Sequence, residues 1–173
     1  IQSRDIAKIF RLNPEHRYGE AYSKQLNDLN FCCRGFLTGS IDLVLTDNED
    51  LSIARWWVAD WKSNWIGNVQ NGAEIVKCGP NNYTSKAMQE QMLIHHYPLQ
   101  AHIYLIALHR FLEWRLPDYN PITHLGGYIY MFLRGIPSTE ELENRPNTKH
   151  IPGLIVEKAP IDRIKELDRL LKI

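Results

Sequence analysis

Two aspartates and a lysine in the first half of the chain have types and spacing that suit metal-assisted chemistry. Asp60 and Lys62 are two residues apart, and Asp42 precedes them. Mg²⁺ prefers hard oxygen ligands and is commonly held by one or two carboxylates, waters and a phosphate. A lysine beside such an ion can orient a water and stabilise charge on the phosphate. The set predicts a site that holds a divalent metal against a phosphodiester, with the main-chain oxygen of Trp61 as a third ligand.

Gln100 and Tyr104 supply a second pair of polar groups further along the chain. They are four residues apart in a segment with helical periodicity, so they share one face of the predicted helix. The glutamine amide and the tyrosine hydroxyl could each donate to a phosphate oxygen or hold the metal-binding segment in place. The alternative is a half-buried helix face, with Tyr104 in the core and Gln100 at its rim.

The aspartates and the lysine also have a purely structural interpretation. Asp42 and Asp60 could cap turns at strand ends, or one of them could pair with Lys62, which could itself be a surface lysine. Both aspartates have aliphatic neighbours, and a buried charge is costly unless it is paired or metal-bound. An aspartate and a lysine two apart form a short motif, so these residues alone leave both interpretations open.

Two predicted strands position the acidic residues. Residues 37–45 and 55–62 are rich in β-branched, aliphatic and aromatic residues and are joined by a polar, turn-prone segment, which predicts a hairpin. Asp42 is expected inside the first strand and Asp60 near the end of the second. Since side chains alternate between faces, Asp60 and Lys62 should share a face from which Trp61 points away.

The remaining elements complete an α/β pattern. We expect a long loop over 66–83, a helix opened by Thr84 or Ser85, a helix that begins at Pro98 and runs to about Leu116, a strand over 128–134 and a terminal helix from Pro160. This order is typical of an α/β domain with a mixed central sheet flanked by helices. Residues 1–34 predict only one or two helical turns and a loop, and we take them as an N-terminal extension of a core over 35–173.

The composition of the chain disfavours several classes of protein function. The chain has 173 residues, and its 20 basic and 20 acidic residues cancel, which disfavours a large phosphate-coating surface but not a local cleft. Its three cysteines form no C-x-x-C pair, so neither a disulfide framework nor a zinc site is expected. No apolar run reaches the ~18 residues of a membrane span, and no signal peptide is visible. We expect a cytoplasmic protein without membrane association.

Several runs of sequence, taken together and in order, resemble one family. They are GFLTGSIDLV, WWVADWKSNWIG, YTSKAM, HHYPLQAHIYLIALHRFLEWRLPDYN and HLGGYIYMFLRG. These runs closely resemble the nuclease domain at the C-terminus of RecB subunits of RecBCD helicase–nucleases (exodeoxyribonuclease V), within the PD-(D/E)xK nuclease superfamily. The resemblance covers residues 35–135 and is most specific between Tyr97 and Tyr119.

The resemblance implies a restriction-endonuclease-like core and metal-dependent hydrolysis of DNA during double-strand-break repair by homologous recombination. By position, Asp42 and Asp60 are the metal-binding carboxylates, Lys62 is the catalytic lysine, and Gln100 and Tyr104 form the Q-x-x-x-Y motif. One or two Mg²⁺ ions are implied, with Mn²⁺ or Ca²⁺ as substitutes. The implied partners are single strands of DNA delivered from a duplex end, RecC- and RecD-like subunits, and RecA.

Two departures from the family stand out. Trp61 replaces the usual tyrosine of the D-Y-K-S-N-W signature, a tolerable change because only its carbonyl is required. The family also has a histidine metal ligand on a helix well upstream of the first aspartate, where this chain has only His16, in a setting unlike that helix. Because the chain lacks an initiator Met, we expect the ligand to precede residue 1, which would leave this fragment with weak metal binding and cleavage. The rival hypothesis is a catalytically weak or inactive nuclease-fold module that docks DNA, partner subunits or a recombinase.

Overall fold

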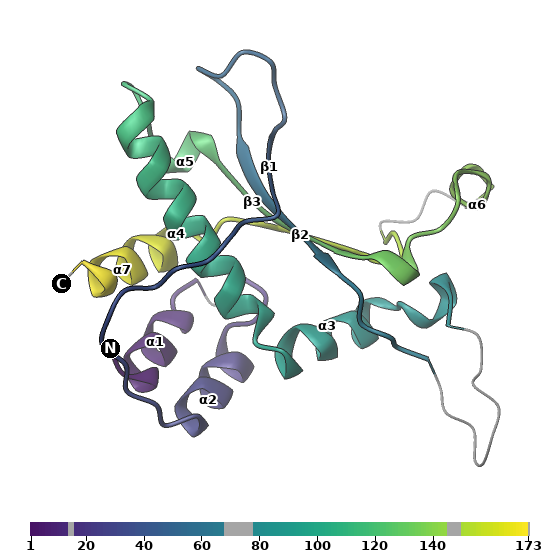
Figure 1. Ribbon diagram of the computed structural model, residues 1–173, viewed down its shortest axis with the longest axis horizontal. Helices are drawn as coiled ribbons and strands as arrows, with labels where there is room; N and C mark the ends of the chain where they lie inside the picture. Colours follow the sequence, from purple (N-terminus) through teal and green to yellow (C-terminus); the bar gives the residue numbers. More distant parts are fainter. Residues whose placement is uncertain (14–15, 68–77, 145–149, 173) are drawn as a thin grey trace.

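A four-stranded mixed sheet, with helices packed on one of its faces, forms the centre of the molecule (Figure 1). The computed structural model describes residues 1–13, 16–67, 78–144 and 150–172. The strands are β1 (Leu43–Thr46), β2 (Trp56–Lys62), β3 (Leu125–Phe132) and β4 (Leu154–Lys158). The helices are α1 (Ser3–Phe10), α2 (Glu20–Asp28), α3 (Ser85–Ile94), α4 (Tyr97–Arg115), α5 (Pro121–His124), α6 (Thr139–Glu143) and α7 (Ile161–Leu171), with short 3-10 turns at Pro80–Asn82 and Leu133–Gly135.

The strands lie in the order β1-β2-β3-β4, which is also their order in the sequence. β1 and β2 pair antiparallel as a hairpin, β2 and β3 pair parallel, and β3 and β4 pair antiparallel. In this register Leu43 lies opposite Ala59, and Asp60 lies beside Tyr130. The predicted hairpin and the predicted mixed α/β class are therefore confirmed.

One hydrophobic core joins the helices to the inner face of the sheet. α4 packs on β2 and β3, and α7 contacts both α4 and α1. At the centre the fully buried ring of Phe10 lies against that of His102. The buried guanidinium of Arg163 donates to the main-chain oxygen of Leu12 at 2.8 Å, which ties α7 to the end of α1. Residues 1–34 thus pack into the same core as the sheet, and the boundary expected at residue 34 stays a prediction.

α3 begins where the sequence predicts, and α4 begins at Tyr97, one residue before the predicted start. The hydroxyl of Thr84 accepts a hydrogen bond from the main-chain N–H of Ala87 and caps α3, as such residues commonly do. His96 has a left-handed backbone conformation with φ of 53° and separates α3 from α4. Pro98 occupies the first turn of α4, where its missing N–H costs nothing.

The first strand is shorter than predicted, and the prediction that Asp42 lies inside it is wrong. β1 begins at Leu43, so Asp42 lies one residue before it. The reason is visible in the hydrogen bonding, because the main-chain N–H of Trp61 donates to Oδ2 of Asp42 at 3.2 Å. A side-chain oxygen thus takes the place of the main-chain acceptor that would continue the ladder.

Other differences concern the first 34 residues, β3 and β4. The two helices α1 and α2 replace the weak structure expected over residues 1–34, and β4 replaces a stretch to which no element was assigned. β3 starts earlier than predicted, because Gly126 and Gly127 lie within the strand instead of before it. Most of the loop predicted over 66–83 lies outside the described residues. Within the described part of the chain, no helix is long and apolar enough to cross a membrane.

Candidate active site

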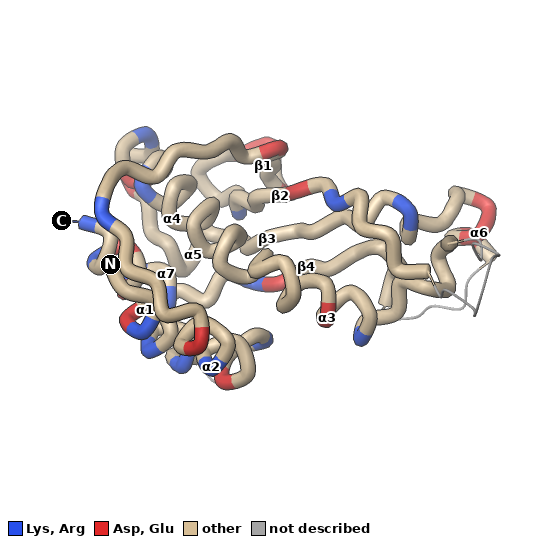
Figure 2. The backbone as a smooth tube through the Cα atoms, turned by 60° about the horizontal axis from the view of Figure 1, so that its bottom comes forward, with Lys and Arg blue, Asp and Glu red and all other residues tan. Residues whose placement is uncertain are grey.

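Asp60 and Lys62 lie side by side at the end of β2, on the face of the sheet that α4 covers. Both are nearly buried, with 4% and 8% of their surface exposed, whereas Trp61 between them is 45% exposed. The predicted alternation is therefore confirmed. Figure 2 shows an acidic position followed by a basic one near the end of β2. Since buried charges are rare unless paired or coordinated, the pair is unlike ordinary surface charge.

The ammonium of Lys62 has two polar partners. It forms an ion pair with the carboxylate of Asp60 and donates to the side-chain oxygen of Gln100 at 3.0 Å. Gln100 lies in the first turns of α4, so this hydrogen bond joins the helix to β2. The structure thus brings together three of the predicted site residues from two elements far apart in sequence.

Gln100 is also the centre of a wider hydrogen-bond network. Its Oε1 accepts a second hydrogen bond from the hydroxyl of Tyr130 on β3 at 2.9 Å, and its Nε2 donates to the hydroxyl of Tyr104 at 3.0 Å. Both lone pairs of the amide oxygen are therefore occupied. Gln100 holds Lys62 and Tyr104 in place, and its oxygen has no capacity left for a further donor.

Asp42 approaches the same end of β2 from the neighbouring strand. Its side chain is exposed, and one oxygen accepts from the N–H of Trp61 at 3.2 Å. By extension of the β1–β2 register beyond Leu43 and Ala59, Asp42 lies opposite Asp60. The two predicted carboxylates are thus neighbours, one exposed and one buried.

The electrostatics of the site reflect this arrangement. Burial raises the pKa of Asp60 above its usual range, the hydrogen bond and charge of Lys62 oppose the rise, and the charge of Asp42 adds to it. Burial, with the negative charge of Asp60, also raises the pKa of Tyr104. Two neighbouring carboxylates that disfavour each other's charge are the situation that a bound cation relieves.

The donor set fits magnesium better than a transition metal. Among the described residues, no group of three His, Cys, Asp or Glu side chains is placed to hold a metal ion. Mg²⁺ does not need such a cage, because it keeps several waters and uses one or two carboxylates together with substrate phosphate. Asp42, Asp60 and the main-chain oxygen of Trp61 are oxygen donors of this kind.

His16 lies away from these carboxylates. Its Nε2 is 2.7 Å from the main-chain oxygen of Lys158, at the end of β4, and its Nδ1 is 2.9 Å from the main-chain oxygen of Arg17. Both ring nitrogens lie within hydrogen-bond distance of main-chain oxygens, and that His16 is not the family's metal ligand stays a prediction.

Sequence reasoning missed the aromatic residues around the lysine. Tyr97 and Tyr130 lie against Lys62, and Asn64 bonds to Tyr97. Asn64 and Tyr97 fall inside the runs on which the resemblance rests, which is the one signal that could have drawn attention to them.

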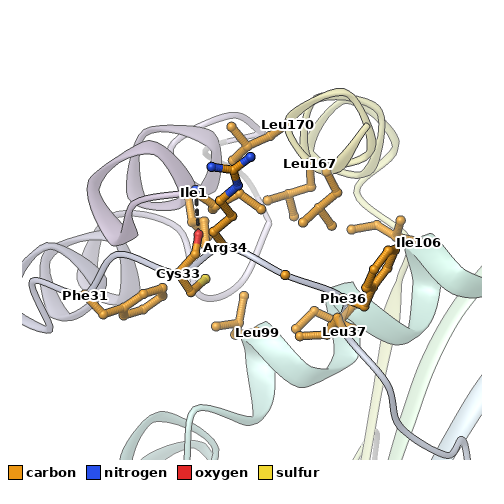
Figure 3. Close-up of a pocket in the computed structure, with 14 residues that line it drawn as sticks. Ile1, Phe31, Cys33, Arg34, Phe36, Leu37, Leu99, Ile106, Leu167 and Leu170 are labelled. Atoms are coloured by element: carbon orange, nitrogen blue, oxygen red, sulfur yellow. Dashed lines mark hydrogen bonds between the residues drawn. The ribbon is translucent and has the colours of Figure 1, made fainter. Parts of the chain in front are cut away.

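A separate apolar pocket lies on another face of α4 (Figure 3). Its cavity of about 240 Å³ is lined by Ile106 on α4, Leu167 and Leu170 on α7, and Phe36 and Leu37 of the extended segment before β1, among others. The lining is almost wholly apolar and includes none of the predicted site residues. The pocket therefore adds no group to the chemistry at Lys62.

The fold and the site define a mixed α/β domain with a buried acid–lysine pair at the end of a central strand. No protein-family model matches the chain. Curated proteins do, and eight of them carry the name RecBCD enzyme subunit RecB. The protein of Mycolicibacterium smegmatis is 36% identical over 80% of this chain and 12% of its own length. That of Mycobacterium tuberculosis H37Rv is 43% identical over 60% and 8%, and that of Escherichia coli K12 is 38% identical over 70% and 9%.

These matches confirm the predicted resemblance, and the chain is similar to a part of RecB subunits. It spans about a tenth of the length of the curated relatives that it matches, between 8% and 12%.

Proposed function

We propose that this chain is the metal-dependent nuclease domain of a RecB-type helicase–nuclease and hydrolyses DNA phosphodiesters during double-strand-break repair. The observation that carries the proposal is the pairing of buried Asp60 and Lys62, with the lysine fixed by Gln100 and with Asp42 one residue before the adjacent strand β1. The names of the relatives support it, because they are RecB subunits of the RecBCD enzyme. On this proposal the activity is that of an exodeoxyribonuclease of the exonuclease V type.

The charge and position of each site residue would determine its role in the reaction. Asp42 and Asp60 would hold Mg²⁺, with the main-chain oxygen of Trp61 as a further ligand. The ion would supply Lewis-acid polarisation of the phosphate and lower the pKa of water. Lys62, released from its ion pair when Asp60 binds the cation, would direct its ammonium at the attacking water or at the charge that develops on the phosphate.

The hydrogen-bond network would keep these side chains in fixed positions relative to one another. Gln100 holds the ammonium of Lys62 through its oxygen and Tyr104 through its amide nitrogen. The hydroxyl of Tyr104 would then be directed toward the substrate beside Asp60. Such preorganised donors cost little reorganisation during the reaction, which is why they are effective in a site shielded from water.

The partners follow from the same family. A helicase motor would deliver single strands from a duplex end, RecC- and RecD-like subunits would complete the enzyme, and RecA would receive the processed strand. Mn²⁺ or Ca²⁺ would compete for the same oxygen ligands.

One observation favours a second candidate function, a docking module without activity. No histidine or third acidic side chain in the described part of the chain joins Asp42 and Asp60, and Lys62 already neutralises the buried carboxylate. Such a module would keep the fold and bind DNA, partner subunits or a recombinase without cutting.

Cleavage of end-labelled single-stranded DNA in Mg²⁺ separates the two candidates. We expect the parent chain to cut, Lys62→Ala to lose ~100-fold or more of the rate, and the exposed control Lys165→Ala to cut like the parent. Calorimetry should show Mg²⁺ binding that Asp60→Asn weakens. A folded chain that neither cuts nor binds Mg²⁺, both at its present length and when extended at its N-terminus to include the expected histidine ligand, would support the docking module instead.

A further inference from the structure

The ammonium of Lys62 lies against two aromatic rings as well as its polar partners. It is 4.0 Å from the ring centroid of Tyr97 and 5.0 Å from that of Tyr130. A cation over an aromatic face is attracted by the ring quadrupole, and more strongly when water is excluded. Lys62 is only 8% exposed, so these rings form one wall of the space that confines its ammonium.

Tyr97 is fixed on several sides. Its hydroxyl donates to Oδ1 of Asn64 at 3.1 Å, and its main-chain oxygen lies 3.1 Å from the hydroxyl of Tyr130, whose single proton it shares with Gln100. The rings of Tyr97 and Tyr130 also stack, with centroids 5.6 Å apart and planes inclined by 24°. A ring held by its hydroxyl, its face and its backbone cannot swing away from the lysine without breaking several contacts.

Asn64 is itself anchored. Its Nδ2 donates to Oε1 of Gln91 on α3 at 3.3 Å, and its main-chain oxygen accepts from the hydroxyl of Tyr83 at 2.6 Å. Since Asn64 follows Lys62 by two residues, the segment leaving β2 is fixed at the point where it bonds to Tyr97. The backbone segment that carries Lys62 therefore also holds the ring of Tyr97 in place, through Asn64.

We propose that Tyr97, anchored by Asn64, is a positioning residue that confines the ammonium of Lys62 for the reaction. A free lysine side chain populates many rotamers, and the ring removes much of that freedom before substrate binds. The inference rests on the proposed nuclease function, because it assigns Tyr97 a role only through Lys62. The ring of Tyr97 confines the ammonium, and the hydroxyl of Tyr97 holds the ring in place through Asn64.

The matched variants are Tyr97→Phe, which keeps the ring, and Tyr97→Leu, which removes it. Tyr119→Leu is the control, since it removes a tyrosine near the far end of α4. We expect Tyr97→Phe to keep its single-turnover rate within ~3-fold of the parent, and Tyr97→Leu to lose ~10- to 100-fold in kcat with little change in KM. Tyr119→Leu should leave kcat unchanged.

A second readout does not depend on cleavage. In carbon–proton correlation spectra, ring currents should shift the ε-methylene signal of Lys62 upfield in the parent and in Tyr97→Phe, and Tyr97→Leu should abolish most of the shift. Lys62→Ala identifies the signal. An unshifted Lys62 signal in the parent, or a folded Tyr97→Leu variant that cuts at the parent rate while Lys62→Ala does not, overturns the inference. If Lys62→Ala cuts like the parent, the proposed function fails instead, even though the shift is present.

Discussion

Lys62 and Gln100 are joined by a hydrogen bond of 3.0 Å, from Nζ to Oε1, between residues 38 positions apart in sequence. The same oxygen accepts from the hydroxyl of Tyr130 at 2.9 Å. One amide oxygen thus connects β2, α4 and β3 at the site. Because charge-assisted hydrogen bonds are stronger than neutral ones, the lysine is held in a defined direction before any ligand arrives.

Gln100→Leu should impair cleavage without unfolding the chain. The substitution removes the acceptor of Lys62 and the donor to Tyr104, so the ammonium regains freedom and the rate should fall ~10- to 100-fold. Gln89→Leu is the control, because Gln89 lies on α3 and bonds to Ser85 in its own helix. Single-turnover cleavage of labelled DNA provides the measurement. A Gln100→Leu variant as fast as Gln89→Leu would show that the network is dispensable.

Gly127→Ala should destabilise the sheet at the β3–β4 pairing. Gly127 has φ of +153°, and a Cβ atom there would overlap the main-chain oxygen of Glu157. Backbone atoms cannot move aside cheaply, so we expect a loss on the order of 2–4 kcal/mol in the free energy of unfolding. Gly39→Ala is the matched control, since no heavy atom lies within 4 Å of the position that its Cβ would take. Urea unfolding curves that coincide for the two variants would contradict the prediction.

Acid should destabilise the fold through His102. Burial lowers the pKa of this histidine to about 3, helped by the positive charge of Arg163, from an ordinary value of 6.5. Between these two values the unfolded chain binds a proton that the folded chain does not. Stability from His102 is therefore fully present above pH 6.5 and is lost as the pH falls toward 3, at up to about 1.4 kcal/mol per pH unit.

The test is urea unfolding at a series of pH values for the parent and for His102→Gln, whose amide can still donate and accept. In the folded protein Nδ1 of His102 lies 2.6 Å from the main-chain oxygen of Pro98. The variant should be less stable at pH 7 but should lose stability less steeply between about pH 6 and 4. Parallel pH slopes in parent and variant would exclude His102 as the source.

The sequence predicts local geometry in this protein better than it predicts long-range contacts. The shared face of Asp60 and Lys62 follows from strand alternation, and the start of α3 follows from the capping chemistry of Thr84. Both depend only on neighbours in the chain.

The contacts that assemble the candidate site join residues far apart in sequence, and the periodicity of the sequence does not predict them. The hydroxyl of Tyr130 reaches Gln100 only because β3 pairs in parallel with β2. β4 was missed for a similar reason. Its five residues from Leu154 to Lys158 are too few for a clear pattern, and their partner strand is what makes them a strand.

The parallel pairing of β2 with β3 also has a consequence for how the protein is made. Trp56 pairs with Leu125 and Lys62 with Phe132, so the chain must close a long loop before the two strands meet, and contacts between distant segments form slowly. Lys62 acquires its contact with the ring of Tyr130, on β3, only at that point. A newly synthesised or half-folded chain therefore contains Asp42, Asp60 and Lys62 before the candidate site is assembled, and the proposed cleavage would require that β2 and β3 have already paired.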